Sequence, residues 1–132
     1  MYHCLRHIPG LWQSALETRH DILARLCIVH MVHEARGLDM CPSHQKRLHN
    51  ARDEESLSIL DVIYREEITH VGSGMRWFQY VSQRLGEHDI VLFHDLARQH
   101  FKGTLKPPFN DEARAEAGFT EEWYLPLVQR KQ

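Results

Sequence analysis

The chain has 132 residues, the length of one small domain, and this is enough to form a hydrophobic core. Hydrophobic residues make up 42% and charged residues 26%, proportions that exclude an intrinsically disordered protein. The formal net charge of -2 gives no general attraction to nucleic acid or to an anionic membrane, so we expect neither as a partner. We predict a single domain over residues 1–132.

The cysteines and the apolar stretches indicate where the protein resides. Cys4, Cys27 and Cys41 form no CxxC pair, so the sequence indicates neither a disulfide framework nor a zinc knuckle. Free thiols are typical of a reducing compartment. The first residues lack the apolar run of a signal peptide, and the most apolar stretch, residues 22–32, is too short to span a bilayer. We expect a cytoplasmic protein.

The first half of the chain predicts one long helix and a loop. Apolar residues recur at intervals of three and four over Leu11–Arg36, which is the pattern of an amphipathic helix. Gly37 is expected to end this helix, because glycine is common just past a helix C-terminus. Residues 38–45, which contain Pro42, are predicted to form a loop.

The second half predicts a second long helix followed by shorter ones. The long helix is expected over Asp53–Leu85, with Gly86 ending it. Three shorter helices are expected, over Asp89–Phe101, over Asp111–Ala117 and from Thr120 onward, with a turn segment over residues 102–110. No alternating strand pattern occurs. The sequence therefore predicts an all-α fold with two long antiparallel helices plus shorter C-terminal helices.

Polar residues lie on the predicted inner faces of both long helices. At about 100° per residue, Glu67 falls among the apolar residues of the second helix, and His70 lies one turn further at the edge of that sector. On the first helix His30 and Glu34 share the stripe of buried leucines. If the helices pack through these stripes, we expect the two polar clusters to meet.

A buried carboxylate needs a cation, and a divalent metal is one solution. A Glu on one helix with Glu-x-x-His on the next is the set that half of a di-iron or di-manganese bundle supplies. Carboxylates suit iron and manganese and bridge two ions, and imidazole suits iron. The alternative is that other side chains satisfy the carboxylates, with Arg36 or Arg65 pairing Glu34, and Tyr64 or a histidine bonding Glu67.

Several stretches together resemble a known family. They are "GLWQSALETRHDILARL" at residues 10–26, "EARGLD" at 34–39, "YREEITHVGSGMRWF" at 64–78, and "LKPPFN" with "EARAEAGF" within 105–119. They resemble the C-terminal half of the ferritin-like domain-of-unknown-function-455 family, and the resemblance covers nearly the whole chain. It implies a ferritin-like helical half-bundle.

The resemblance also implies a ligand set. In the ferritin-like superfamily each half-bundle supplies one Glu and one Glu-x-x-His, and the matching positions here are Glu34, Glu67 and His70. His30 stands where the family more usually has a different residue, and it is either an additional ligand or a hydrogen-bonded histidine. A full member carries an earlier helix pair with its own ligands. We therefore expect either a homodimer or a missing N-terminal half to complete a site for two ions.

The function implied by the resemblance is metal-dependent oxidation. We expect a di-iron or di-manganese carboxylate oxidase or oxygenase, acting on a small molecule that the sequence does not identify. Two alternatives stay open. One is a non-catalytic interaction or assembly remnant that lacks a complete metal site, and the other is an enzyme similar to the ferritin-like tRNA hydroxylases.

Overall fold

The computed structural model describes residues 10–128, and helices dominate them. The elements are α2 (Leu11–Glu17), α3 (Ile22–Arg25), the π-helix η1 (Leu26–His33), α4 (Glu34–Asn50), α5 (Glu54–Arg84), α6 (Asp89–His100), α7 (Asp111–Glu116), α8 (Glu121–Tyr124) and the 3₁₀-helix η2 (Leu125–Leu127). Within residues 10–128 the only strand-like pairing is an isolated bridge between Leu105 and Val128. The prediction of an all-α fold is confirmed.

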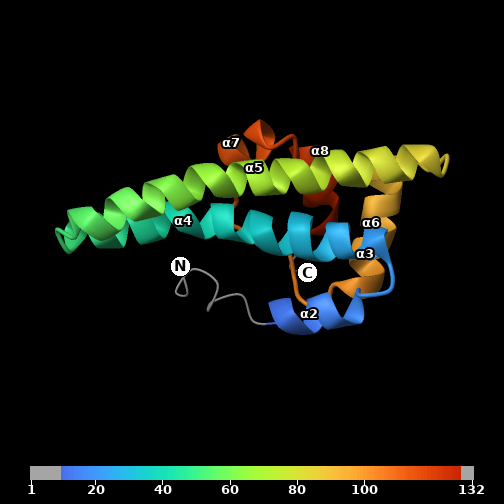
Figure 1. Cartoon of the computed structure of the whole chain (residues 1–132), viewed down its shortest axis with the longest axis horizontal. Coiled ribbons are helices and arrows are strands. Elements are labelled where there is room, and N and C mark those ends of the chain that lie inside the picture. The colour runs from blue at the N-terminus through green and yellow to red at the C-terminus, as the bar shows by residue number, and fades with distance from the viewer. Residues whose placement is uncertain (1–9, 129–132) are drawn as a thin grey trace.

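A long helical hairpin is the frame of the molecule. Helices α3, η1 and α4 follow one another without interruption from Ile22 to Asn50, and we call them the first rod. The first rod runs antiparallel to α5, and residues 51–53 join the two (Figure 1). The Asp53 side chain begins α5 by accepting a hydrogen bond of 3.0 Å from the Ser56 amide. The predicted pair of long antiparallel helices is therefore present.

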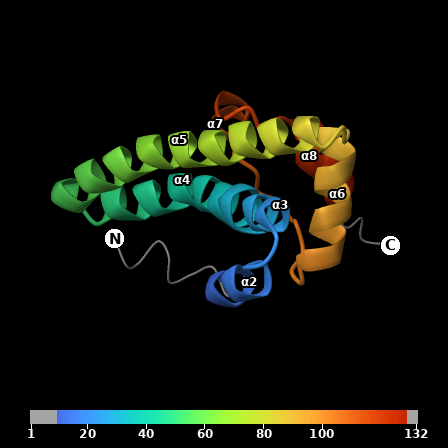
Figure 2. The same cartoon turned by 45° about the vertical axis from the view of Figure 1, so that its right-hand side comes forward.

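The shorter helices surround this hairpin. Helix α6 crosses its end, α7 packs against α5 and α4, and α8 packs against α6 (Figures 1 and 2). In both views α2 lies on the side of the first rod opposite α5. The shorter C-terminal helices begin at the predicted residues or within one residue of them. The molecule thus has a covered side, where aromatic residues of α5, α6 and α8 meet, and a more open hairpin face.

The prediction that the first helix runs over Leu11–Arg36 and ends at Gly37 is wrong. The helix breaks after Glu17, and a new one begins where Asp21 accepts hydrogen bonds from the amides of the second and third residues after it, at 2.9 and 3.1 Å. It then continues through Gly37 because the neighbouring Ala35 and Leu38 are fully buried. That burial offsets the cost of about 1 kcal/mol for a helical glycine.

The predicted loop over residues 38–45 is also wrong, since this segment belongs to α4. Pro42 has no amide hydrogen, so the carbonyl of Leu38 loses its helical partner. The side-chain amide of Asn110 donates to that carbonyl at 3.2 Å. A residue far away in the sequence thus compensates for the proline, and the helix continues.

The core lies between the hairpin and the C-terminal helices. Four buried aromatic residues meet edge to face, with ring centroids 5.5 to 6.2 Å apart in four of their contacts. They are Phe78 of α5, Phe93 of α6, Trp123 of α8, and Phe119, which lies between α7 and α8. Such aromatic contacts add to the stability from apolar burial. This cluster fixes α6 and α8 against the covered side of α5.

Two of the three cysteines lie among the described residues, and both are buried. Cys27 is buried with its Sγ 3.7 Å from the carbonyl oxygen of Phe93, and burial raises the pKa of its thiol. Cys41 is also buried, whereas Cys4 lies outside the described residues. Within residues 10–128 no helix has both the length and the apolar character needed to cross a bilayer.

Candidate metal-binding site

The first rod contributes His30 and Glu34. Their side chains contact each other, with His30 Nδ1 3.2 Å from Glu34 Oε1. This hydrogen bond raises the pKa of His30, in spite of its partial burial. His30 lies within the π-helical segment and Glu34 directly follows it, and π-helical turns are often found at functional sites.

Helix α5 contributes Glu67 and His70. They are three residues apart, so they lie on the same face, and His70 Nδ1 is 3.3 Å from Glu67 Oε2. The Glu67 side chain is 25% exposed and the His70 side chain is 56% exposed. The four predicted residues therefore form two carboxylate–histidine pairs, one on each helix of the hairpin.

The two carboxylates of these pairs influence each other across the hairpin. Burial and the negative charge of Glu34 both raise the pKa of Glu67, and His70 opposes this only in part. One oxygen of Glu34, Oε2, is buried and has no hydrogen-bond partner among the described residues. Two carboxylates thus share a half-buried space with less compensation than they need.

Of the alternative partners predicted from the sequence, a histidine does contact Glu67, namely His70, whereas the arginines and Tyr64 are engaged elsewhere. Arg36 contacts Asp39 and donates to two main-chain carbonyls, and Arg65 donates to the carbonyl of Asp61. The Tyr64 hydroxyl accepts a hydrogen bond from Asn110 at 2.8 Å. No described arginine or tyrosine therefore neutralises the Glu34 and Glu67 carboxylates.

A close helix contact places these residues beside an open cleft. A Cβ added to Gly74 would lie 2.8 Å from the Cβ of His30, so glycine is what allows α5 to approach η1 at this point. The cleft has a volume of about 280 Å³, and its lining is Leu26, His30, Glu34, His70, Ser73, Gly74 and Trp77. Three of the four predicted site residues line this cleft.

The donor atoms are of the right type for iron or manganese, but they do not converge on one point. Within residues 10–128 no three His, Cys, Asp or Glu side chains are arranged so that they could hold a metal ion together. The orphaned oxygen of Glu34 fits a cation, whereas the two pairs as they stand form an incomplete coordination shell. Further donors would have to come from outside this hairpin.

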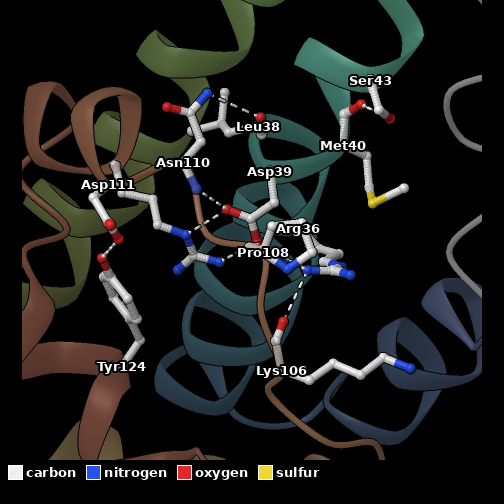
Figure 3. A network of polar contacts seen from close by, with 11 residues as sticks. Arg36, Leu38, Asp39, Met40, Ser43, Lys106, Pro108, Asn110, Asp111 and Tyr124 are labelled. Carbon is white, nitrogen blue, oxygen red and sulfur yellow. Dashed lines mark hydrogen bonds and ion pairs between the residues drawn. The ribbon is translucent and has the colours of Figure 1, made fainter.

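A buried ion pair that no sequence pattern predicted joins α4 to α7. Arg114 Nε and Nη2 donate to the two carboxylate oxygens of Asp39 at 2.8 and 2.7 Å, and the side chains are 1% and 0% exposed (Figure 3). The Asp39 carboxylate also accepts from the main-chain amide of Asn110 at 2.9 Å. Both residues occur in the motifs quoted above, but no periodicity marks them, because they belong to separate short segments.

A second cavity was not predicted either, because its lining also comes from segments that are separate in the sequence. It has a volume of about 520 Å³ and lies between α2, α4 and residues 101–109. His33 and Ser14 line it and are hydrogen-bonded, with His33 Nε2 3.0 Å from Ser14 Oγ. Burial lowers the pKa of His33. The break between α2 and α3, which no sequence pattern predicted, is what folds Ser14 back onto His33.

Fold and site together define a class: an all-α protein whose central hairpin carries two carboxylate–histidine pairs. Comparison with known proteins gives the family. The chain matches the family described as "Protein of unknown function (DUF455)" over residues 2–125, and it belongs to that family. The resemblance proposed from the quoted motifs is thus confirmed.

A similar protein supports this membership. The chain is 38% identical over 123 residues to a protein of Haemophilus influenzae (strain ATCC 51907 / DSM 11121 / KW20 / Rd) named "Uncharacterized protein". The match covers 91% of this chain and 43% of that protein, so the chain spans less than half the length of this relative. No solved structure matches the chain.

Proposed function

We propose that this chain supplies half of a carboxylate–histidine centre for two iron or manganese ions. The observation that carries the proposal is the pair of carboxylates on facing helices. Glu34 has a buried oxygen with no hydrogen-bond partner in residues 10–128, and its charge raises the pKa of Glu67. A cation between them would remove both penalties.

Each residue has a defined role in this proposal. Glu34 and Glu67 hold the ions, and His70 and His30 add imidazole nitrogens. In both pairs Nδ1 lies beside a carboxylate oxygen, at 3.2 and 3.3 Å, so the imidazole and the carboxylate would present donor atoms side by side. Such ions, when bound, would activate oxygen or peroxide for oxidation of a small molecule. We further propose a cytoplasmic location, in line with the Cys27 thiol, which forms no disulfide.

The missing donors require a second helix pair. Trp77 borders the cleft and is 59% exposed, and α5 also exposes the apolar side chains of Ile59, Val62 and Tyr80. Large exposed apolar side chains near an incomplete site favour an interface. We propose that a second copy of the chain packs on this face, so that two sets of Glu34, Glu67 and His70 complete the centre. A separate N-terminal half is the other possible source.

Manganese titration tests the proposal. Free Mn²⁺ is measured by electron paramagnetic resonance while the protein is added, and we expect the signal to fall as the ion binds. Glu67→Gln should weaken binding by about tenfold or more. Glu66→Gln is the matched control, because Glu66 is the exposed neighbour of Glu67 and should bind like the unchanged protein.

Two different results would contradict the proposed metal centre. Equal Mn²⁺ affinity in the Glu67→Gln and Glu66→Gln variants would mean that the ion does not use this carboxylate. If the unchanged protein retains neither Mn²⁺ nor anaerobically added Fe²⁺, the second candidate function is favoured. That candidate is a non-catalytic assembly module, and it already agrees with the lack of a convergent donor trio in residues 10–128.

A further inference from the structure

We propose that the cavity between α2, α4 and residues 101–109 is a binding site for a small organic anion, an apolar molecule that carries a carboxylate or phosphate group. Its volume of about 520 Å³ lies within the range of small-molecule sites. It shares no lining residue with the cleft beside Glu34 and His70. The proposal is therefore independent of the metal centre.

Arg36 brings positive charge to the cavity wall. Its only acidic contact within residues 10–128 is Asp39 at 3.4 Å, but Asp39 is already neutralised by the two shorter hydrogen bonds from Arg114. Arg36 Nη1 also donates to the carbonyls of Lys106 and Pro108, both at 3.0 Å, and these carry no net charge (Figure 3). Much of the Arg36 charge thus remains uncompensated at the cavity wall.

The two lysines that line the cavity differ in whether an acidic side chain balances their charge. Lys102 forms an ion pair of 2.6 Å with Glu17, so its charge is balanced. Lys106 pairs with no acidic side chain in the described part of the chain, and it lines the cavity together with Arg36. Arg36 shares the single Asp39 carboxylate with Arg114, and Lys106 has no acidic partner among the described residues, so positive charge is in excess at this cavity. Such an excess favours an anion, with which guanidinium and ammonium groups form charge-assisted hydrogen bonds.

The rest of the cavity wall is largely apolar. Apolar side chains form much of it, namely Val32, Met40, Phe101, Leu105 and Phe109. His33 and Ser14 add a hydrogen-bonding pair to this wall, with His33 Nε2 3.0 Å from Ser14 Oγ. An occupant that suits both parts of the wall has an apolar body and one anionic group.

The test uses three ligands that share one ring system. We would titrate 2-naphthoate, 2-naphthyl phosphate and the neutral 2-naphthalenemethanol into the ¹⁵N-labelled chain and follow amide chemical shifts. We expect at least one of the anions to bind about tenfold or more tightly than the neutral alcohol. The largest shifts should fall in residues 32–40 and 101–106.

Two variants locate the anionic group. Lys106→Gln should weaken binding of that anion by about tenfold and leave the alcohol unchanged. Lys46→Gln, an exposed lysine that does not line the cavity, should have no effect. Lys106 is exposed, so its replacement should not impair folding, which the amide spectrum checks.

Each of several results would overturn the proposal. One is equal affinity for the anions and the alcohol. Another is an equal loss of anion affinity in the Lys106→Gln and Lys46→Gln variants. Shifts centred on Trp77 would place the ligand at the other cleft, and absence of binding by both anions up to their solubility limit would show that the cavity is not an anion site.

Discussion

At the scale of single residues, the Asp39–Arg114 pair is the interaction most sensitive to substitution. Removing one partner of a buried ion pair leaves the other charge uncompensated and costs about 3–5 kcal/mol. We expect Arg114→Met to lower the free energy of unfolding by about this amount, as measured by urea denaturation. In the exposed pair of Arg98 and Asp95, Arg98→Met should cost less than about 1 kcal/mol. Similar losses in the two variants would contradict a special role for the buried pair.

His33 and His30 should give opposite pH dependences, because burial lowers the pKa of His33 and the bond to Glu34 raises the pKa of His30. The stability associated with neutral His33 is complete above the ordinary histidine pKa and is lost as pH falls through the lowered value. The contribution of protonated His30 to stability is complete below the ordinary histidine pKa and is lost as pH rises through the raised pKa of His30.

Removing each histidine should therefore change the acid limb of the stability curve in opposite directions. His33→Gln should make the loss of stability on acidification shallower, and His30→Gln should make it steeper. Urea unfolding with a chelator present, from about pH 8 to about pH 5, measures both slopes. A change of the same sign in both variants would show that these two pKa shifts do not control the acid limb.

At the scale of secondary-structure elements, two helical glycines should respond in opposite ways to alanine. A Cβ at Gly74 would lie 2.8 Å from the Cβ of His30 and 3.2 Å from its carbonyl oxygen, so Gly74→Ala must push α5 away from η1. We expect a loss of about 1–3 kcal/mol in unfolding free energy. At Gly37 the nearest atom is 3.9 Å away, which is an ordinary contact. Gly37→Ala should stabilise by up to about 1 kcal/mol.

Thermal unfolding of the two alanine variants compares them directly. Both glycines are inside long helices, so helix propensity alone predicts a gain for each. A higher midpoint for both would mean that the close contact between α5 and η1 relaxes without cost. Opposite signs would confirm that Gly74 is required for the approach of the two helices.

At the scale of the whole molecule, the exposed face of α5 should control self-association. Trp77 borders the candidate metal cleft, whereas Trp12 lies on α2 and is 76% exposed. If a second copy covers the cleft, Trp77→Glu should weaken the dimer by about tenfold or more, as measured by sedimentation equilibrium. Trp12→Glu should leave the dimer constant unchanged. A chain that is monomeric at all concentrations would remove the second copy as the source of the missing ligands.

Local signals in the sequence were enough to determine the second long helix and the helices after it. Asp53 caps α5 through its own side chain, and Gly86, with a positive φ of 72°, follows its last turn. The regular helical spacing also predicted that Glu67 and His70 lie on one face, and in the structure their side chains contact each other. Whether these residues bind a metal stays a prediction.

Only the tertiary structure decided the course of the first rod. Gly37 and Pro42 are strong local signals for a helix end, but they are offset by burial of Leu38 and by a hydrogen bond from Asn110 to its carbonyl. It also decided the pairing of Asp39 with Arg114. The physical reason is the same in each case: the compensating group comes from a segment distant in the sequence, and a local pattern carries no information about such contacts.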